Sequence, residues 1–551
     1  MSKFFLTTPI YYVNDKPHVG HMYTTVVADA LARFHRLSGD EVFLSVGTDE
    51  NSQKNIQAME KAGEQDFAAY LERMSGVWKT TWKESGISFD DFVRTTEERH
   101  LKGVRRFWDA VLASGDIYPG EYEGWYCVGC EGFKVETDLT NGVCPLHPNK
   151  PLQHVKEKNY FFRLTKYRDQ LLALYDESST FVMPESRRNE IRNYVADHLS
   201  DISISREAPS APAGIPVPGD DSQRMYVWFD ALLNYMTVVG YGTDEVMFKK
   251  WWPTDLHLVG KDIIKFHCAL WPAMLMSAAK NDPLLQAANG QPLLPKQVYA
   301  HGFFTINGQK ISKSLGNAVD PRELADVYGM DALRYFLLRE VSFGEDGDFS
   351  FDRLSERYTN DLANTLGNLL NRVIAMSRKY FDGKVPEVDR EAAGRIEFGL
   401  LTVYGANEQG ERICRFRKEE FLELARLVGS EYARCRCDRA LKMIWFGEAS
   451  VEEANRKIQE TQPFKLIKTD EKKTAEVLYA LLEACRWYAW MIAPMMPETA
   501  KKIWTQLGLD AEQELQKGWS HALIWGQLPC GQTLPEPQIL FPAIVAKEEA
   551  M

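Results

Sequence analysis

The 551-residue sequence contains no apolar run that reaches the roughly 20 residues needed to span a bilayer. No signal peptide is recognisable, because Met1-Ser2-Lys3 leads directly into a strand-like segment. The chain also lacks an excess of basic residues, and its net charge of −12 argues against a protein that simply coats nucleic acid. Its nine cysteines, an odd and mostly scattered set, do not suggest a disulfide framework. We therefore expect a cytoplasmic protein that contacts no membrane.

Hydrophobic residues make up 45% and aromatics 12% of the chain, which is enough for well-filled globular cores. A chain of this length is too long for one core and suggests several domains. Residues 1–115 alternate strand-like and helical patterns, which predicts a parallel α/β unit. That periodicity breaks over 116–225, as expected of an insertion, and we expect the sheet to resume at Tyr226–Ala231. Beyond about residue 355 the pattern is almost entirely helical.

The segment His18-Val19-Gly20-His21 lies where a predicted strand, Phe4–Thr8, gives way to a predicted helix. A helix N-terminus presents unpaired N–H groups and a positive dipole end, and both favour phosphate. Gly20 allows a ligand to approach the backbone, and the two imidazoles can donate hydrogen bonds to phosphoryl oxygens. The alternative interpretation is a helix start with two polar residues.

A second segment, Lys310-Ile311-Ser312-Lys313-Ser314, follows an Asn307-Gly308 turn signal. Lysines in such a loop suit a mobile clamp on ATP phosphates, whereas an ordinary surface loop is the alternative. The two segments, in this order, resemble the signature motifs of class I aminoacyl-tRNA synthetases. Thr8–Tyr12 and Gly47–Glu50 are similar to the methionyl-tRNA synthetase family in particular.

This resemblance covers about residues 4–372. It implies activation of L-methionine with ATP and Mg²⁺ to methionyl-adenylate, followed by transfer of the methionyl group to tRNA(Met), including the initiator tRNA. AMP and pyrophosphate would be released. The residues that it implies for catalysis are His18, His21, Lys310 and Lys313. Those that it implies for ATP binding are His18, Gly20, His21, Gly260, Asp262 and Lys313, with Asp262 as an acceptor for ribose hydroxyls.

Asp49 ends the second predicted strand, and ligands collect at the carboxyl ends of strands in open parallel sheets. It is therefore placed to bind a cation such as a substrate ammonium, although a helix N-cap near Asn51 is the alternative. The resemblance implies that it binds the amino group of methionine. The next residues, Glu50-Asn51-Ser52, depart from the Glu-His-Gly that many family members carry.

Ile263, His267 and Trp271 recur at i, i+4 and i+8 of a predicted helix, a spacing that more often serves core packing than a pocket. Methionine needs flat apolar walls that tolerate a thioether. The resemblance implies such a pocket, lined by Ile10, Tyr12, Trp228, Tyr235, Ile263, His267 and Trp271. It also places Arg206 near the mouth of the active site, where an ordinary strand-end charge is the alternative.

The predicted insertion contains the pattern C-x2-C-x13-C-x2-H, formed by Cys127, Cys130, Cys144 and His147. Two paired sets of soft ligands at this spacing suit a tetrahedral Zn²⁺. Four protein ligands leave no open position, so we expect one structural zinc ion. A redox CxxC or fortuitous cysteines are the alternatives. The pattern resembles the single-knuckle form of the family.

Asn364, Asn368 and Arg372 are spaced i, i+4, i+8 in the helical region, and such side chains can read unstacked bases. A polar solvent-facing surface is the alternative. The resemblance assigns Asn368 and Arg372 to anticodon recognition and places Phe464 where relatives usually have a base-stacking tryptophan. We see no appended dimerisation domain and expect a monomer.

We thus predict a Rossmann-like α/β parallel-sheet catalytic domain, split by a zinc-binding insertion and followed by an α-helical bundle anticodon-binding domain. The expected parts are the first catalytic half at 1–115, the insertion at 116–225, the second half at 226–310, a lysine-loop linker at 311–355 and the anticodon-binding domain at 356–551. Leucyl, isoleucyl, valyl and cysteinyl synthetases, a small HxGH nucleotidyltransferase and a zinc-dependent RNA-binding protein are the rival interpretations.

Overall fold

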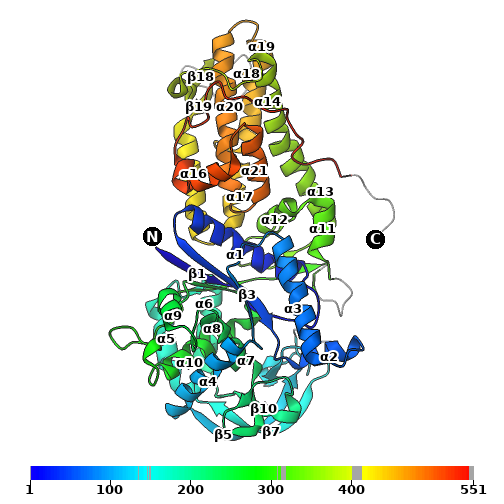
Figure 1. The fold of residues 1–551 in the computed structure, drawn as a ribbon, viewed down its shortest axis with the longest axis vertical. Helices are drawn as coiled ribbons and strands as arrows, with labels where there is room; N and C mark the ends of the chain where they lie inside the picture. The colour runs from blue at the N-terminus through cyan, green and yellow to red at the C-terminus, as the bar shows by residue number, and fades with distance from the viewer. Residues whose placement is uncertain are drawn as a thin grey trace. The chain divides into compact units, whose positions relative to one another are not determined.

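The computed structural model forms two compact units (Figure 1). We call residues 3–17 and 42–302 the sheet unit, and residues 1–2, 18–41 and 303–551 the helical unit. The residues that the structure describes are 2–134, 136–145, 147, 150–306, 308–311, 318–399 and 413–544. None of the described helices combines the length and apolar character needed to cross a membrane.

A seven-stranded sheet forms the centre of the sheet unit, with strand order β2-β3-β1-β13-β14-β8 and β4 paired to β3. Its strands are β1 (Lys3–Thr7), β2 (Tyr11–Tyr12), β3 (Glu41–Asp49), β4 (Asp91–Arg94), β8 (Val182–Met183), β13 (Leu256–Gly260) and β14 (Val298–His301). The recorded pairs, such as β1–β13 and β2–β3, are parallel. All residues of β13 and all but the first of β3 are buried, as expected of strands covered on both faces. The predicted parallel α/β sheet is confirmed.

The helices of the sheet unit connect and cover these strands. They are α2 (Gln53–Lys61), α3 (Phe67–Glu84), α4 (Glu98–Ala113), α5 (Arg168–Glu177), α6 (Glu185–His198), α7 (Val227–Ala231), α8 (Asn234–Thr237), α9 (Glu245–Trp251) and α10 (Trp271–Ala278). Most of the buried apolar side chains in this unit form one continuous cluster, in which Phe107, Phe229 and Trp271 are almost fully inaccessible. This core holds the carboxyl ends of the strands, and the site residues near them, in place.

One local prediction is wrong, and a second needs a change of helix type. The segment 226–231 does not resume the sheet, because Tyr226 O accepts from Phe229 N at 2.8 Å and from Asp230 N at 3.3 Å, which closes the short helix α7. The sheet resumes at β13 instead. The expected helix through 263–271 is present and continuous, but its type changes from 3₁₀ at Lys261–Ile263 to π at Phe266–Leu270 and then to α in α10.

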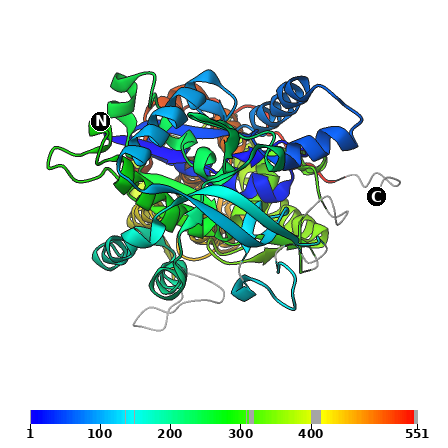
Figure 2. The same cartoon turned by 90° about the horizontal axis from the view of Figure 1, so that it is seen from below.

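Parts of the predicted insertion, drawn as cyan strands in Figure 2, form two small antiparallel sheets. The predicted boundary 116–225 is too wide, because β8 lies within it and pairs in parallel with β14 of the central sheet. One contains β6 (Gly132–Lys134), β5 (Ile117–Cys127), β7 (Gln153–Phe162) and β9 (Ile202–Ser203). The other contains β10 (Ser205–Glu207), β12 (Asp220–Met225) and β11 (Pro216–Val217). β5 and β7 pair over ten residues and carry the turn with the first two cysteines at one end.

The helical unit is built around α20 (Glu471–Ile492), which is buried without interruption from Val477 onward. Its other helices are α1 (Val19–Leu37), α11 (Pro321–Tyr328), α12 (Met330–Arg339), α13 (Phe351–Arg357), the π-helical segment Tyr358–Gly367, α14 (Asn368–Tyr380), α15 (Arg390–Ala393), α16 (Lys418–Ala433), α17 (Cys437–Trp445), α18 (Val451–Thr461), α19 (Pro463–Leu466), α21 (Pro497–Gln506) and α22 (Ala511–Gln516). The unit also contains β15 (Phe304–Ile306), β16 (Gln309–Lys310) and β17 (Gly347–Asp348), which form a small sheet. The hairpin β18 (Arg395–Gly399) and β19 (Ile413–Arg417) is an exception to the helical pattern predicted beyond residue 355.

A buried ion pair fixes α1 within the helical unit. Arg334 Nη2 on α12 donates to Asp29 Oδ2 on α1 at 2.6 Å, and the same guanidinium donates through Nε to Met495 O at 2.7 Å. Asp29 and Arg334 are both inaccessible to solvent, so breaking one partner would leave a buried charge. The start of α1 is also tied down, because Val19 N donates to Val319 O at 3.1 Å.

Candidate active site and metal site

His18 and His21 lie together at the start of α1. His18 is the N-cap residue and has an extended backbone, and its Nδ1 accepts from Gly20 N at 3.1 Å. In return, His18 N donates to His21 Nδ1 at 3.3 Å, which completes a capping box built from two imidazoles. The structure therefore brings both predicted histidines to one helix N-terminus.

The structure shows why position 20 is a glycine, which the sequence alone did not reveal. A Cβ at this position would lie 2.9 Å from Cε1 of His18, closer than such contacts normally allow. The glycine therefore makes room for the imidazole of His18 at the helix N-terminus. Its predicted contact with ATP stays a prediction.

The lysine loop is only partly described. Lys310 lies in β16, where its backbone is opposite Thr305 of β15. Lys313 lies outside the described residues, so its predicted role also stays a prediction.

In the sheet unit, Tyr235 and His267 are buried partners within the predicted methionine pocket. Tyr235 Oη lies 2.7 Å from His267 Nε2, and His267 Nδ1 lies 3.0 Å from Ile263 O. Because the carbonyl can only accept, Nδ1 carries the proton and Nε2 accepts from the tyrosine hydroxyl. Burial lowers the pKa of His267 to about 4, so the ring is neutral at physiological pH.

Two indoles flank this pair. The ring of Trp271, fully buried, lies 6.4 Å from that of Tyr235. Trp228 is half-buried and stacks on Phe266 with ring centroids 4.0 Å apart and an interplanar angle of 4°. Phe266 immediately precedes His267, so the stack adds an aromatic wall that sequence analysis missed.

Tyr12 lies in β2, the strand that ends the sheet order beside β3, and Ile10 immediately precedes that strand. Tyr12 in β2 is the register partner of Asp49 in β3. Ile10 contacts the end of β3, since a Cβ at Gly47 would lie 3.1 Å from its Cγ2. Burial raises the pKa of the Tyr12 hydroxyl well above its usual range, and the charges of Glu131 and Asp49 raise it further. Tyr12 is thus paired with Asp49 at the end of β3, and the joint role of the predicted pocket residues stays a prediction.

Asp49 does not cap a helix. Ser52 is the N-cap of α2 and accepts from Lys54 N, so the alternative interpretation of Asp49 is wrong. Asp49 Oδ1 instead accepts from Asn51 N at 3.3 Å, and Asn51 Nδ2 donates to Asp230 Oδ2 at 3.1 Å. Burial raises the pKa of the Asp49 carboxyl well above its usual range, and the negative charges of Asp230 and Glu131 raise it further.

Gly260 and Asp262 occupy the end of β13 and the turn that follows. Gly260 is the last, buried residue of the strand, and Asp262 is exposed in the 3₁₀ turn. This is the edge of the sheet where ligands of such folds are usually bound.

Arg206, predicted near the mouth of the site, is a buried residue of β10. Its Nε donates to Glu157 Oε2 at 3.1 Å, and its guanidinium lies 4.1 Å from the ring centroid of Tyr126. Both partners of this ion pair are only 5% exposed. Arg206 is thus a buried, ion-paired residue, and its place near the mouth of the site stays a prediction.

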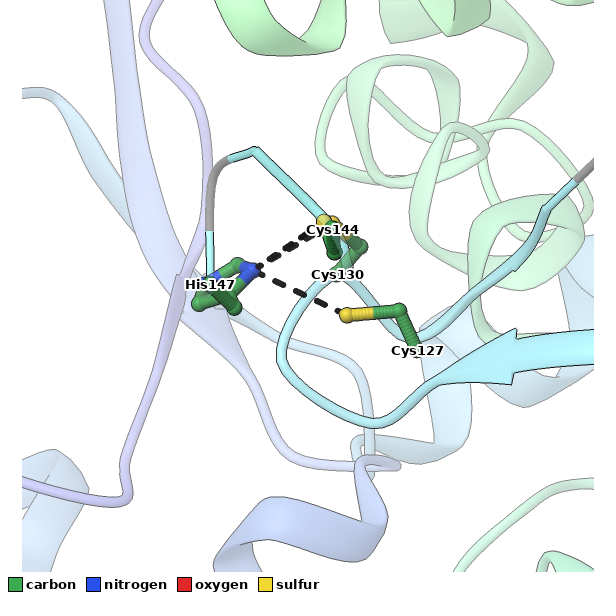
Figure 3. Close-up of side chains that lie close together, drawn as sticks. All are labelled: Cys127, Cys130, Cys144 and His147. Carbon is green, nitrogen blue, oxygen red and sulfur yellow. Dashed lines mark hydrogen bonds between the residues drawn. The ribbon is translucent and has the colours of Figure 1, made fainter. Parts of the chain in front are cut away.

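Cys127, Cys130, Cys144 and His147 form one cluster, with all four ligand atoms within 4.8 Å of one another (Figure 3). His147 Nδ1 lies 3.4, 3.8 and 4.0 Å from Sγ of Cys130, Cys127 and Cys144, and the Sγ atoms of Cys130 and Cys144 are 3.5 Å apart. Tetrahedral ligands with metal bonds of about 2.0–2.3 Å are separated by roughly 3.5–3.8 Å. The cluster therefore fits one tetrahedral metal ion.

The local backbone and electrostatics suit such an ion. A Cβ at Gly129 would lie 2.4 Å from Cγ of His147, so the knuckle needs a glycine there. The neighbouring thiol of Cys130 lowers the pKa of Cys127 to about 3, which favours the thiolate that a metal binds. No other group of three or more such ligands is found in the described part of the chain.

The predicted anticodon residues occupy the helical unit. Asn364 and Asn368 are exposed and Arg372 is half-exposed. Asn364 lies in the π-helical segment and not in the same α-helix as the other two, and Asn368 Nδ2 donates to Asn364 O at 3.1 Å. Phe464, in the short helix α19, is 43% exposed and presents an aromatic surface to solvent.

Glu131, Asp230 and the Asn51-Ser52 pair were not identified as site residues from the sequence. They come from segments that are far apart in the chain, so no local spacing could group them. The one available signal was that Asn51-Ser52 replaces the usual His-Gly.

Comparison with known families gives two matches. A family model described as "tRNA synthetases class I (M)" matches residues 4–150 and 131–374. A second, described as "Anticodon binding domain of methionyl tRNA ligase", matches residues 432–551. Together they cover parts of both units.

Individual relatives align over nearly the whole chain. The methionine–tRNA ligase of Thermotoga maritima is 41% identical over 551 residues, covering 99% of this chain and 81% of the relative. That of Synechocystis is 42% identical, covering 98% of this chain and 97% of the relative.

Solved structures agree with these sequence matches. The structure of Mycobacterium tuberculosis methionyl-tRNA synthetase in complex with methionyl-adenylate matches with a TM-score of 0.85 and 38% identity, covering 98% of this chain and all of that one. The apo form of the same enzyme matches with a TM-score of 0.78 and 35% identity.

Proposed function

The chain belongs to the methionyl-tRNA synthetase family, and from this premise we propose which of its residues carry the reaction. It is a methionine–tRNA ligase, which activates methionine with ATP and transfers the methionyl group to tRNA(Met), releasing pyrophosphate and AMP. The observation that carries this function is the 41% identity to a methionine–tRNA ligase over 99% of the chain.

Methionine-dependent exchange of pyrophosphate into ATP tests the function directly. The assay is run with each of the twenty amino acids, and exchange is expected with methionine. Exchange with cysteine or leucine would instead indicate a rival synthetase. Exchange with none would favour the zinc-dependent RNA-binding protein.

We propose that methionine binds among the side chains at the ends of β2, β3 and β13. Ile10, Tyr12, Trp228, Tyr235, Ile263, His267 and Trp271 would enclose its side chain, and Asp49 would bind its ammonium group. The fixed neutral tautomer of His267 supports an apolar pocket, because a charged imidazole there would oppose burial of a thioether. Discrimination against smaller aliphatic side chains would come from apolar burial, about 1–3 kcal/mol per methylene.

Attack of the methionine carboxylate on the α-phosphorus of ATP needs no covalent enzyme intermediate. The protein's work is positioning and neutralisation of charge on the phosphates. His18 and His21 would donate to these oxygens, Lys313 with Lys310 would stabilise the leaving pyrophosphate, and Mg²⁺ would bind the same oxygens. Gly20 and Gly260 would allow close backbone approach to ATP, and Asp262 would accept from its ribose hydroxyls.

We propose that the Cys127, Cys130, Cys144 and His147 cluster holds one structural Zn²⁺. When bound, the ion would cross-link the turn after β5 to the segment that carries Cys144 and His147. The ligand distances support this assignment, because they match tetrahedral coordination without an open position.

Recognition of tRNA(Met), including the initiator tRNA, is assigned to the helical unit. Asn364, Asn368 and Arg372 would hydrogen-bond to anticodon bases, and Phe464 would stack on one of them. We also propose that the protein acts as a cytoplasmic monomer. The proposed parts are a catalytic domain at 1–115 and 226–310, an insertion at 116–225 that also supplies strand β8 to the catalytic sheet, a linker at 311–355 and an anticodon-binding domain at 356–551.

A further inference from the structure

Three carboxyl groups, one of them the proposed ammonium ligand Asp49, are buried and close enough to act on one another electrostatically. Asp49, Glu131 and Asp230 are 4%, 2% and 0% exposed. Within the part of the chain that the structure describes, no lysine or arginine forms a salt bridge with any of them. Buried carboxylates without a cationic partner are costly, so the arrangement needs a proton or a cation.

Hydrogen bonds from two adjacent residues hold these acids in place. Asn51 donates through its backbone to Asp49 Oδ1 at 3.3 Å and through its side chain to Asp230 Oδ2 at 3.1 Å. Ser52 Oγ donates to Glu131 Oε1 at 2.8 Å. Asn51 and Ser52 therefore connect acids from three distant segments.

One oxygen of each newly identified acid has no partner. Glu131 Oε2 and Asp230 Oδ1 are buried and accept no hydrogen bond from the described residues. Glu131 also borders a cavity of about 20 Å³, room for one water molecule, whose lining includes Asn51 and Arg206 but neither Asp49 nor Asp230. Its backbone is held there by Tyr226, whose hydroxyl donates to Glu131 O at 2.6 Å.

The electrostatics agree with this geometry. Burial raises the pKa of Asp230 well above its usual range, and the charge of Glu131 adds to that rise. Lys54 lowers the pKa of Asp49, but its Nζ lies over the Tyr12 ring, 4.3 Å from the centroid. Its effect on Asp49 ranks below those of burial and of the two neighbouring acids.

We propose that Asp230 and Glu131 join Asp49 in binding the ammonium group of methionine, and that Asn51 and Ser52 are their positioning residues. An ammonium group has three N–H donors and a full positive charge. It could therefore donate hydrogen bonds to the two unpaired oxygens and also supply the cation that the buried carboxylates lack. The departure from Glu-His-Gly then has a purpose, because a glycine at position 52 has no hydroxyl to hold Glu131. This inference rests on the proposed role of Asp49 as an ammonium ligand.

Ligands that differ in the amino group test the proposal. Glu131→Gln and Asp230→Asn are compared with wild type for the KM of L-methionine and for the inhibition constants of L-methioninol and 4-(methylthio)butanoate in ATP–pyrophosphate exchange. Methioninol keeps the amine and lacks the carboxylate, whereas the butanoate keeps the carboxylate and lacks the amine. We expect each variant to weaken methionine and methioninol about tenfold and to leave the butanoate unchanged. Equal weakening of all three, or of none, would overturn the proposal.

The variant Asp49→Asn shows whether a negative result concerns only the roles of Glu131 and Asp230 or the ammonium site itself. If Asp49→Asn shows the amine-selective loss and neither other variant does, only the further inference fails. If Asp49→Asn shows no selective loss, the ammonium site itself is misassigned. Because Glu131 follows Cys130, metal content is measured in every variant, and Asp230→Asn provides the test that lies away from the knuckle.

The positioning role of Ser52 is tested by the KM for methionine in two substitutions of this residue. Ser52→Ala should raise the KM for methionine with the same amine selectivity and little change in kcat, and Ser52→Thr, which keeps the hydroxyl, should restore the wild-type value. A non-selective loss in Ser52→Ala would show that only the helix cap matters, and would overturn this part of the proposal.

Discussion

The imidazole rings of His18 and His21 stack with their centroids 3.7 Å apart. Each Nδ1 accepts a hydrogen bond from a backbone N–H of the same helix start. An imidazole that accepts through Nδ1 must carry its proton on Nε2 when neutral. The capping box therefore selects, in both rings, the tautomer that donates through Nε2, which is the form that a phosphoryl oxygen requires.

Gly20→Ala should separate stability from catalysis. The added methyl would meet Cε1 of His18 at 2.9 Å and displace the ring, while alanine favours the helix by up to about 1 kcal/mol over glycine. We expect the melting temperature to stay or rise and the exchange rate to fall about tenfold or more. Gly76→Ala in α3, where a Cβ meets nothing within 4 Å, should raise stability alone. Unchanged exchange in Gly20→Ala would contradict the role of His18.

Tyr12→Ala and Trp228→Ala should raise the KM for methionine far more than the KM for ATP. Both side chains belong to the proposed methionine pocket, and Trp228 also supports Phe266 by stacking. Steady-state exchange kinetics in both substrates measure the difference, which we expect to be about tenfold or more. Trp228→Phe, which keeps a stacking ring, should be milder, and Trp125→Ala, 38% exposed on β5, should have no effect. An equal rise in both KM values would remove these residues from the pocket.

Local signals in the sequence were enough for much of the fold. The sequence was enough to predict β1, α1 and β3, because apolar runs and a 3.6-residue periodicity can be recognised within one short continuous segment. The segment 226–231 was mistaken for a strand because a short buried run has no periodicity that distinguishes it from a helical turn. The π-helical segment 266–270 was missed because residues four apart lie on one face in either helix.

In the candidate site, too, features carried by neighbouring residues could be predicted, whereas contacts between distant segments could not. The metal-ligand cluster was predictable because its residues come in two adjacent pairs, and the chemistry of tetrahedral coordination fixes their spacing. The pairing of Ser52 with Glu131, and of Asn51 with Asp230, depends on folding that brings distant segments together. Only the completed sheet and insertion reveal it.

Loss of one knuckle ligand should release the metal and loosen the insertion. Cys127→Ser removes one of the four ligands of the cluster, so we expect zinc content to fall well below the one ion per chain expected in wild type. Elemental analysis and limited proteolysis near residues 128–147 measure both effects. Cys530→Ser, which changes a cysteine outside the cluster, should retain the metal. Wild-type protein purified without chelator and found free of zinc would refute the assignment.

The neutral buried histidines of the sheet unit should contribute stability that is lost in acid, opposed by the buried carboxyls of Asp49 and Asp230, whose raised pKa values favour the folded state as pH falls. Burial lowers the pKa of His100 to about 3 and that of His267 to about 4, against about 6.5 in an unfolded chain. Below about pH 6.5 the unfolded chain therefore binds protons at these histidines that the folded unit does not, and their contribution to stability falls until the pH passes the folded values. His100→Gln should reduce this dependence by up to about one proton, seen in urea midpoints at pH 7 and pH 5. The exposed His154→Gln should leave the dependence as in wild type, and an unchanged slope in His100→Gln would contradict the prediction.

Phe464→Ala should affect the tRNA step alone. Its ring is 43% exposed at α19, and stacking of a base on such a ring contributes about 1–3 kcal/mol. We therefore expect the KM for tRNA(Met) in aminoacylation to rise about tenfold, while ATP–pyrophosphate exchange, which uses no tRNA, stays at the wild-type rate. Phe464→Trp should bind tRNA at least as well as wild type, because the indole offers a larger face. Phe446→Ala, a 39% exposed phenylalanine of the same unit, controls for loss of an exposed ring. A matching rise in both alanine variants, or an equal fall in exchange, would mean that Phe464 stabilises the helical unit and does not contact the anticodon.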